Sequence, residues 1–143
     1  MNSIPYSDEL LQTILQQTKT IALVGASANP DRASNEVMNF LLTKGYTVIP
    51  VNPGLAGKEL LGQTVYASLS DIPHTVDMVD VFRNSDAVGP IVDEAITRGD
   101  KVIWTQLEVI DHAAAARAKA AGLIMIMDRC PKIEYPRLNL DNS

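Results

Sequence analysis

The sequence predicts an α/β protein with a Rossmann-like, doubly wound and mostly parallel five-stranded sheet in a three-layer α/β/α arrangement. Short apolar runs alternate with segments of helical periodicity along the chain. The runs are apolar at nearly every position, as in parallel strands that helices cover on both faces. A chain of 143 residues has the length of one domain, so we expect a single Rossmann-like domain over residues 1–143.

Five segments are expected to form the sheet. Each is short, apolar and bounded by glycine, proline or polar residues, which favours a strand over a helix. Right-handed crossovers favour the sheet order 3-2-1-4-5, counting the strands along the chain. A shorter strand over residues 64–66 is expected in the long crossing between the second and third strands. The five strands are expected within residues 21–24, 46–51, 76–82, 101–107 and 123–127.

Segments with helical periodicity fill the connections between these strands. The N-terminal helix lies within residues 1–19 and starts at Ser7, whose hydroxyl can cap it. No pattern marks residues 135–143, which we expect to form a loose tail. The remaining helices are expected over residues 35–44, between Asn84 and Gly99, and over residues 111–122.

Charge and composition narrow the classes of partner. The formal net charge is −5 and the 12 lysines and arginines are scattered, which disfavours a nucleic-acid partner. The single cysteine, Cys130, cannot form an internal disulfide, as in a protein of a reducing compartment. The N-terminus lacks the pattern of a secretory signal, and no apolar run approaches the roughly 20 residues of a membrane helix. We therefore expect a cytoplasmic protein without a membrane partner.

The stretch IALVGASANPDRAS, residues 21–34, places a candidate binding site where the first strand ends. Gly25 allows a sharp turn and a close approach of the backbone to a ligand. The N–H groups at the start of the next helix favour an anion there, and Ser27, Asn29 and Ser34 can add polar contacts. We expect a phosphate or pyrophosphate at this corner, where doubly wound sheets bind ligands. The alternative is a plain connection that binds nothing.

A nicotinamide dinucleotide is disfavoured by two departures from its usual fingerprint, G-x-G-x-x-G/A followed by an acid near the end of the second strand. Gly25 is present, but the next two fingerprint positions hold Ser27 and Pro30. The second strand ends at Asn52 and Pro53, with no carboxylate for a ribose hydroxyl. An NAD(P)-binding domain remains an alternative.

Three cations, Arg32, Lys58 and Arg83, follow predicted strand ends. Because the carboxyl ends of parallel strands meet at one edge of the sheet, these side chains can converge on one ligand. Such a ligand would carry more phosphate than one helix terminus can satisfy. The alternative is that each cation is a solvated surface charge.

Four motifs, in this order and spacing, resemble the small stand-alone CoA-binding domain proteins of the YccU type. They are VGASANPDRAS, VIPVNP, VDMVDVFR and MDRCPKIE, and the resemblance runs from about residue 20 to residue 134. This family is in turn similar to the CoA-binding domain of the succinyl-CoA synthetase alpha subunit. The resemblance implies a Rossmann-like fold that binds coenzyme A or an acyl-CoA at the point where the strand order reverses.

The resemblance also implies which residues contact the ligand. The first turn would wrap the phosphates, and the end of the fourth strand would border the pantetheine arm. Leu55 replaces the lysine of a Pro-Gly-Lys turn that follows the second strand in the family, and Lys58 comes three residues later. An apolar slot for adenine would be lined by Val51, Pro53, Val81 and Phe82. The candidate binding residues are Gly25, Ala26, Ser27, Ala28, Asn29, Pro30, Arg32, Ser34, Asn52, Pro53, Lys58, Val81, Phe82, Arg83, Thr105, Gln106, Leu107 and Glu108.

The sequence shows no complete catalytic site. The synthetase reaction uses a phosphorylated histidine of a second domain, which we do not expect in this chain, and His74 and His112 are interpreted as surface residues. Asp80 and its acidic neighbours lack metal-site spacing and are expected to be solvated or to cap helices. Cys130, beside Arg129, can serve as a thiol nucleophile or form a mixed disulfide with CoA, although a buried cysteine is the plainer interpretation. We expect a CoA-binding protein without catalysis, with a thiol-dependent acyl-CoA enzyme as the alternative.

Overall fold

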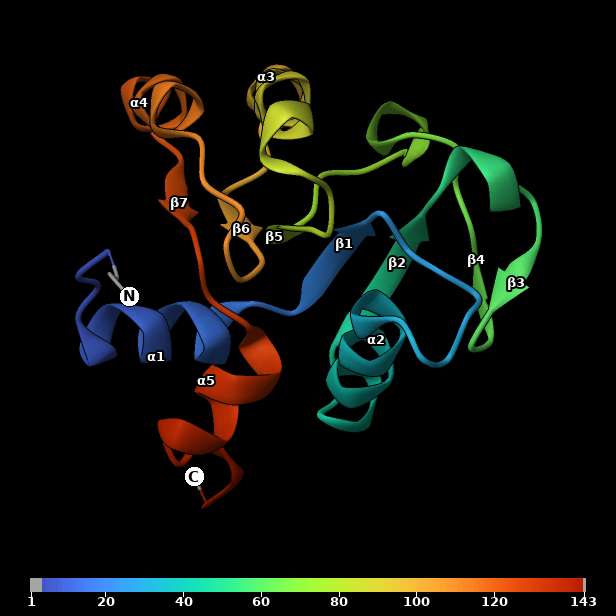
Figure 1. Cartoon of the computed structure of the whole chain (residues 1–143), viewed down its shortest axis with the longest axis horizontal. Helices are drawn as coiled ribbons and strands as arrows, with labels where there is room; N and C mark the ends of the chain where they lie inside the picture. The colour runs from blue at the N-terminus through green and yellow to red at the C-terminus, as the bar shows by residue number, and fades with distance from the viewer. Residues whose placement is uncertain (1–3, 143) are drawn as a thin grey trace.

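A five-stranded sheet lies between two layers of helices in the computed structural model, which describes residues 4–142 without the side chain of Asn142 (Figure 1). Every strand pair of this sheet is parallel. The expected α/β, Rossmann-like fold is confirmed. In sheet order, the strands are β2 (Thr47–Val51), β1 (Thr20–Val24), β5 (Met78–Val81), β6 (Val102–Thr105) and β7 (Ile124–Ile126).

The helices divide between the two faces of the sheet (Figure 1). Each face has its own apolar core, as expected for strands that are apolar on both sides. One face packs against α1 (Asp8–Gln17), α2 (Ala33–Thr43) and α5 (Pro131–Arg137). The other packs against α3 (Val88–Arg98) and α4 (His112–Ala120).

Side-chain caps start two of these helices, whereas α2, α3 and α5 start without one. Ser7 Oγ accepts a hydrogen bond from the N–H of Leu10 at 3.1 Å at the start of α1. Asp111 Oδ1 accepts from the N–H of Ala114 at 2.9 Å at the start of α4. Arg32 precedes α2, and its side chain makes no capping hydrogen bond. The first N–H groups of α2 are therefore left for another partner.

The expected strand order is wrong. Counted along the chain, the strands lie in the order 2-1-3-4-5 rather than 3-2-1-4-5, because β5 pairs with β1 and not with the outer side of β2. The strand order therefore reverses between β1 and β5. In doubly wound sheets this reversal opens a crevice at the carboxyl ends of the strands.

The crossing between β2 and β5 is more structured than expected. It contains an antiparallel pair, β3 (Glu59–Leu60) and β4 (Gln63–Thr64), near the short strand that the sequence predicts over residues 64–66. Tyr66 then pairs with Val51 at the end of β2. The crossing thus runs beside β2 before it passes to the other side of β1.

Arg98, at the end of α3, holds the second half of this crossing in place. Its guanidinium donates hydrogen bonds of 2.7–2.8 Å to the carbonyl groups of Leu69, Ile72 and His74. It also pairs with Asp100, whose side chain is fully buried, at 2.8 Å. One buried, charge-assisted cluster therefore ties the loop to the helix that follows β5.

The end of the chain is folded, so the expectation of a loose tail over residues 135–143 is wrong for its described part. α5 extends into this segment despite an internal proline, and a 3₁₀ turn follows it. Tyr135 packs edge-on against Phe40, with ring centroids 5.7 Å apart, and Leu140 is buried in the core. Ser143 lies outside the described residues.

Gly25 lets the end of β1 approach the end of β5 more closely than a residue with a side chain would. Its φ is +92°, in the left-handed region. A Cβ at this position would overlap the carbonyl oxygen of Phe82 and lie 3.0 Å from its carbonyl carbon. The N–H groups of Gly25 and Ala26 both donate to the carbonyl of Val51, at 3.0 and 3.2 Å. The ends of three strands therefore meet at this glycine.

Asp80 is buried in the middle of the sheet and is not solvated, contrary to expectation. Its neighbours in the strand register are Leu23 and Trp104, both in the apolar core. Neither carboxyl oxygen has a hydrogen-bond partner among the described residues. Burial raises the pKa of Asp80 to about 8, so the group is mostly protonated at neutral pH.

Asp80 should make the stability of the chain depend on pH. The folded chain holds a proton here up to about pH 8, whereas the unfolded chain releases it above about pH 4. The free energy of unfolding should therefore fall as pH rises between these values, by at most about 1.4 kcal/mol per pH unit, and level off above them. Urea unfolding of wild type and Asp80→Asn at pH 5, 6, 7 and 8 measures this contribution as the difference between the two slopes.

The control for this measurement is Asp93→Asn, at an exposed carboxylate that pairs with Arg117 on the surface. It should keep the wild-type slope. Equal slopes in wild type and Asp80→Asn would show that Asp80 is not protonated in the folded chain.

Gly25→Ala should destabilise the fold more than an alanine at a glycine with only a positive φ. Gly62→Ala is the matched control, because Gly62 has a φ of +81° but a Cβ added there would meet no atom within 4 Å. We expect Gly25→Ala to lose at least about 2 kcal/mol more unfolding free energy than Gly62→Ala, since its Cβ meets backbone that cannot move aside. Equal losses in urea titrations would contradict the close approach.

Candidate functional site

A groove runs along the carboxyl ends of the strands and consists of two adjoining cavities. The larger cavity, of about 650 Å³, lies over the ends of β1, β2 and β5. The smaller, of about 230 Å³, extends to the end of β6. Because the cavities share wall residues, they form one continuous site. The shared residues are Gly25, Arg32, Phe82, Arg83 and Asn84.

Many of the residues that the sequence predicts for the site line this groove. The four shared residues other than Asn84 are among them. The larger cavity adds Ala26, Ser27, Asn52 and Pro53. The smaller adds Ser34, Gln106 and Leu107.

Two asparagines hold the first turn in shape by binding its carbonyl groups. Asn52, after β2, donates Nδ2–H to the carbonyl of Ala26 at 2.7 Å, and its Oδ1 accepts from the N–H of Gly54 at 2.7 Å. Asn35, in the first turn of α2, donates Nδ2–H to the carbonyl of Ser27 at 2.8 Å. Side chains from two different elements therefore fix the turn before any ligand arrives.

Several backbone N–H groups around the same turn are open, that is, without a hydrogen-bond acceptor in the described residues. The N–H groups of Ala33 and Ser34, the first of α2, have no acceptor in the described part of the chain. The same holds for the N–H groups of Ser27 and Ala28. Together with the positive end of the helix dipole, open amides of this kind favour an anion.

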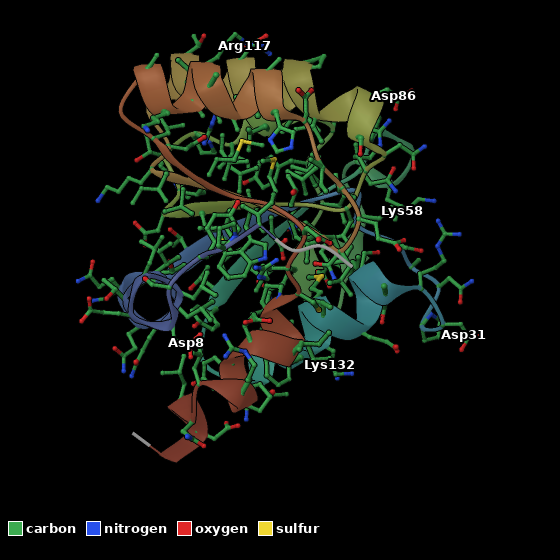
Figure 2. All side chains as sticks on the ribbon, turned by 60° about the vertical axis from the view of Figure 1, so that its left-hand side comes forward. Asp8, Asp31, Lys58, Asp86, Arg117 and Lys132 are labelled. Atoms are coloured by element: carbon green, nitrogen blue, oxygen red, sulfur yellow. The ribbon has the colours of Figure 1, made fainter. Side chains whose placement is uncertain are left out.

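Two arginines bring positive charge to both cavities. Arg32 and Arg83 are exposed, and neither forms an ion pair with a carboxylate of the described residues. Glu94, on another wall of the larger cavity, is engaged by the N–H of Ser70 at 2.8 Å. Lys58, the third expected cation, lies on the outer surface before β3 and lines neither cavity (Figure 2).

Gln106 lies at the end of β6, on the wall of the smaller cavity. Its N–H donates to the carbonyl of Val81 at 3.3 Å, and its carbonyl accepts from the N–H of Val109 at 3.0 Å. The side-chain Oε1 is buried and has no hydrogen-bond partner in the described residues. The backbone of Gln106 is thus fixed while its side chain holds an unused acceptor.

Several expected contact residues do not line either cavity. Some form the exposed tip of the first turn, and two are buried strand ends whose side chains face the core. Glu108 has a φ of +67°, and its N–H donates to Asp128 Oδ1 at 2.6 Å. These residues are Ala28, Asn29, Pro30, Val81, Thr105 and Glu108.

The one catalytic candidate of the sequence, Cys130, does not line the groove. Cys130 is 6% exposed within the apolar core and lines neither cavity. His74 and His112 are exposed, as expected, in the crossing loop and at the start of α4. Within the described residues, no group of three or more histidine, cysteine, aspartate or glutamate side chains could hold a metal ion.

Some residues of the site are not identifiable from the sequence. Asn35 is the first residue of a helix predicted over residues 35–44, and only its burial and its bond to the carbonyl of Ser27 reveal its role. Ser68 and Leu69 reach the larger cavity because the crossing folds back over the sheet. The sequence indicates Asn84 only as the start of a predicted helix, and Val109 completes the smaller cavity. These placements depend on tertiary structure.

Two further cavities, of about 580 and 680 Å³, lie elsewhere on the molecule. The first is at the amino ends of β5 and β6, and the second lies between the end of α1 and the loop after α2. The α-helices that line these cavities present their sides or their carboxyl ends there. The groove is preferred for its chemistry, since its size does not distinguish it.

Comparisons with known proteins give relatives of two kinds. The chain is 36% identical over 125 residues to the uncharacterised protein YneT of Bacillus subtilis, and the match covers 87% of this chain and 91% of YneT. It is 33% identical over 89 residues to acetate–CoA ligase (ADP-forming) I subunit alpha of Pyrococcus furiosus, covering 59% of this chain and 19% of that subunit.

Solved structures show the same two kinds. A hypothetical protein from Pyrococcus horikoshii superposes with a TM-score of 0.89 at 40% identity, covering 97% of this chain and 99% of that one. The apo form of dinucleotide-forming acetyl-coenzyme A synthetase 1 of Candidatus Korarchaeum cryptofilum gives a TM-score of 0.64 at 27% identity, covering 75% of this chain and 25% of that one.

The helices of the described residues are all too short or too polar to cross a membrane.

Membership of a family rests on the extent of these matches. A family model described as a CoA binding domain matches residues 19–136, nearly the whole chain. The resemblance carried by the four sequence motifs is confirmed, and the chain belongs to the CoA binding domain family.

Proposed function

We propose that the chain binds coenzyme A or an acyl-CoA in the groove, without catalysing a reaction by itself. The observation that carries this proposal is the set of open amides at the first turn, beside Arg32 and Arg83. Membership of a CoA binding domain family supports the same ligand. So does the similarity to part of an acetate–CoA ligase subunit.

The chemistry of the groove suits the nucleotide end of coenzyme A. This end carries a pyrophosphate and a 3′-phosphate, which is more negative charge than the start of one helix can neutralise. Arg32 and Arg83 supply the additional positive charge, and as arginines they can bind phosphate oxygens in pairs. Apolar side chains of the larger cavity, among them Val51, Pro53 and Phe82, offer a surface for the adenine.

A nicotinamide dinucleotide fits the groove less well. The end of β2 holds Asn52 where such domains carry an acid for the ribose. The amide of Asn52 already binds the carbonyl of Ala26 and the N–H of Gly54, so it is not available to a ribose hydroxyl. This occupancy favours a ligand that needs no acceptor at this position.

The thiol-dependent alternative requires a cysteine that the ligand can reach. Cys130 is buried in the core and lines neither cavity of the groove. We therefore propose a binding role in acyl-CoA metabolism in the cytoplasm, as a carrier, a sensor or an accessory protein.

Thermal shift measurements with CoA, acetyl-CoA, NAD, NADP and ATP test the proposed ligand. A ligand that binds only the folded state raises the apparent stability by RT ln(1 + [L]/Kd). We expect stabilisation by CoA and acetyl-CoA and little by the other three. Stabilisation by NAD or NADP alone would replace the proposal with the dinucleotide alternative.

Arg32→Glu and Arg83→Glu should each weaken CoA binding by at least about tenfold at low salt, because each replaces a phosphate partner by a repelling charge. The matched control is Lys119→Glu, which makes the same change of charge on an exposed position of α4. It should alter the affinity by no more than about twofold. Isothermal titration calorimetry measures all three, and wild-type affinity in both arginine variants would refute the phosphate assignment.

A further inference from the structure

β7 forms one edge of the sheet, and one of its residues has unused backbone groups. In sheet order β7 comes last, beside β6 alone (Figure 1). The N–H of Ile124 donates to the carbonyl of Lys101, just before β6, at 3.1 Å. Parallel strands bind a neighbour through alternate residues, so Ile124 and Ile126 face β6. The N–H and carbonyl groups of Met125 therefore point away from the sheet.

The N–H groups on either side of Met125 along this edge are occupied. Leu123 donates its N–H to the carbonyl of Ala118, near the end of α4, at 2.9 Å. Met127 donates its N–H to the hydroxyl of Tyr6, also at 2.9 Å. Within the described residues, the N–H of Met125 has no acceptor and its carbonyl has no donor. One open donor and one open acceptor thus lie between two occupied positions.

The side chains at this edge are apolar. Ile124 is 42% exposed, although Ile126, on the same face two residues later, is fully buried in the core. Met125 is half-buried on the other face, against the core beneath α4. An exposed apolar edge strand without a charged residue or a proline is a surface that favours pairing with another strand.

Charges beside the edge differ in sign between its two ends. Arg117 points from α4 toward α3, where it forms an ion pair. Lys119, two residues later, therefore lies on the opposite side of α4, toward the edge, and Lys101 is exposed at the same amino end of the strands. Asp128 follows β7 at the carboxyl end. The guanidinium of Arg129 beside it is already bound to two backbone carbonyl groups.

We propose that this edge is the interface of a homodimer, in which the β7 strands of two copies pair antiparallel about a two-fold axis at Met125. The N–H of each Met125 donates to the carbonyl of the other, which satisfies both open groups of each copy. Ile124 of one copy then packs beside Ile126 of the other, and Asp128 approaches the lysines at the amino end. A second copy suits the edge better than a free peptide, because a peptide strand gains few backbone hydrogen bonds beside the occupied N–H groups.

Sedimentation equilibrium of the chain at about 5–500 µM tests for a dimer of twice 15.5 kDa. We expect wild type to approach the dimer mass within this range, with a micromolar Kd, since the interface is small. Ile124→Lys should raise Kd at least about tenfold, because it places two positive charges near the axis. The matched control is Ile133→Lys, the same change on α5 at a side chain that is 49% exposed. It should dimerise as wild type does.

Amide hydrogen exchange at Met125 gives a second measurement that needs no variant. Its N–H should be protected at high concentration and exchange rapidly on dilution, whereas the N–H of Met127, bound to Tyr6 within one chain, should not respond. A wild type that stays monomeric, a Kd that Ile124→Lys leaves unchanged, or equal weakening by both lysine variants would overturn the interface. So would exchange at Met125 that is independent of concentration. No residue of β7 lines the groove, so these outcomes are separate from those of CoA binding.

Discussion

The contact between Gly25 and the carbonyl group of Phe82 sets the geometry on which the rest of the site depends. It brings the ends of β1 and β5 together at the reversal of strand order, and the shared acceptor of Gly25 and Ala26 on Val51 adds the end of β2. The start of α2 is positioned by this turn, because α2 follows it directly in the chain. The open N–H groups, the arginines and the end of β6 are therefore placed relative to one another by a single approach of backbone to backbone.

The site separates its hydrogen-bonding groups by kind. Near the first turn, asparagine side chains occupy the carbonyl groups, and donors and positive charges remain for a ligand. At the end of β6 the wall is less polar, because Leu107 and Val109 lie beside Gln106 there. An acidic chain of net charge −5 can in this way present a local surface for an anion, since the field at a binding site depends on nearby groups more than on the total charge.

The fold class and the main corner of the site follow from the sequence because they depend on local patterns. Apolar runs, helix caps and a glycine at the end of the first strand are visible one segment at a time. The strand order is not, because it is decided by where a long crossing lands, and β5 lands beside β1. The burial of Asp80 could not be predicted because the local pattern is misleading. A single carboxyl within an apolar strand is typical of a position that faces solvent. The structure of residues 135–142 depends on aromatic packing and one buried leucine, which the sequence pattern of a short helix with an internal proline does not reveal.

The hydrogen bonds from Asn35 and Asn52 to the first turn affect which positions of the turn can vary. Asn35 and Asn52 bind the carbonyl groups of Ser27 and Ala26, and Asn29 Oδ1 accepts from the N–H of Asp31, so the shape of the turn does not rely on the side chains of Ala28 and Pro30. Ala28 and Pro30 are exposed there and carry no core packing. Evolution or engineering can exchange such positions to suit another headgroup while the scaffold keeps its shape. Novelty is then confined to a few solvent-facing positions on an inherited frame.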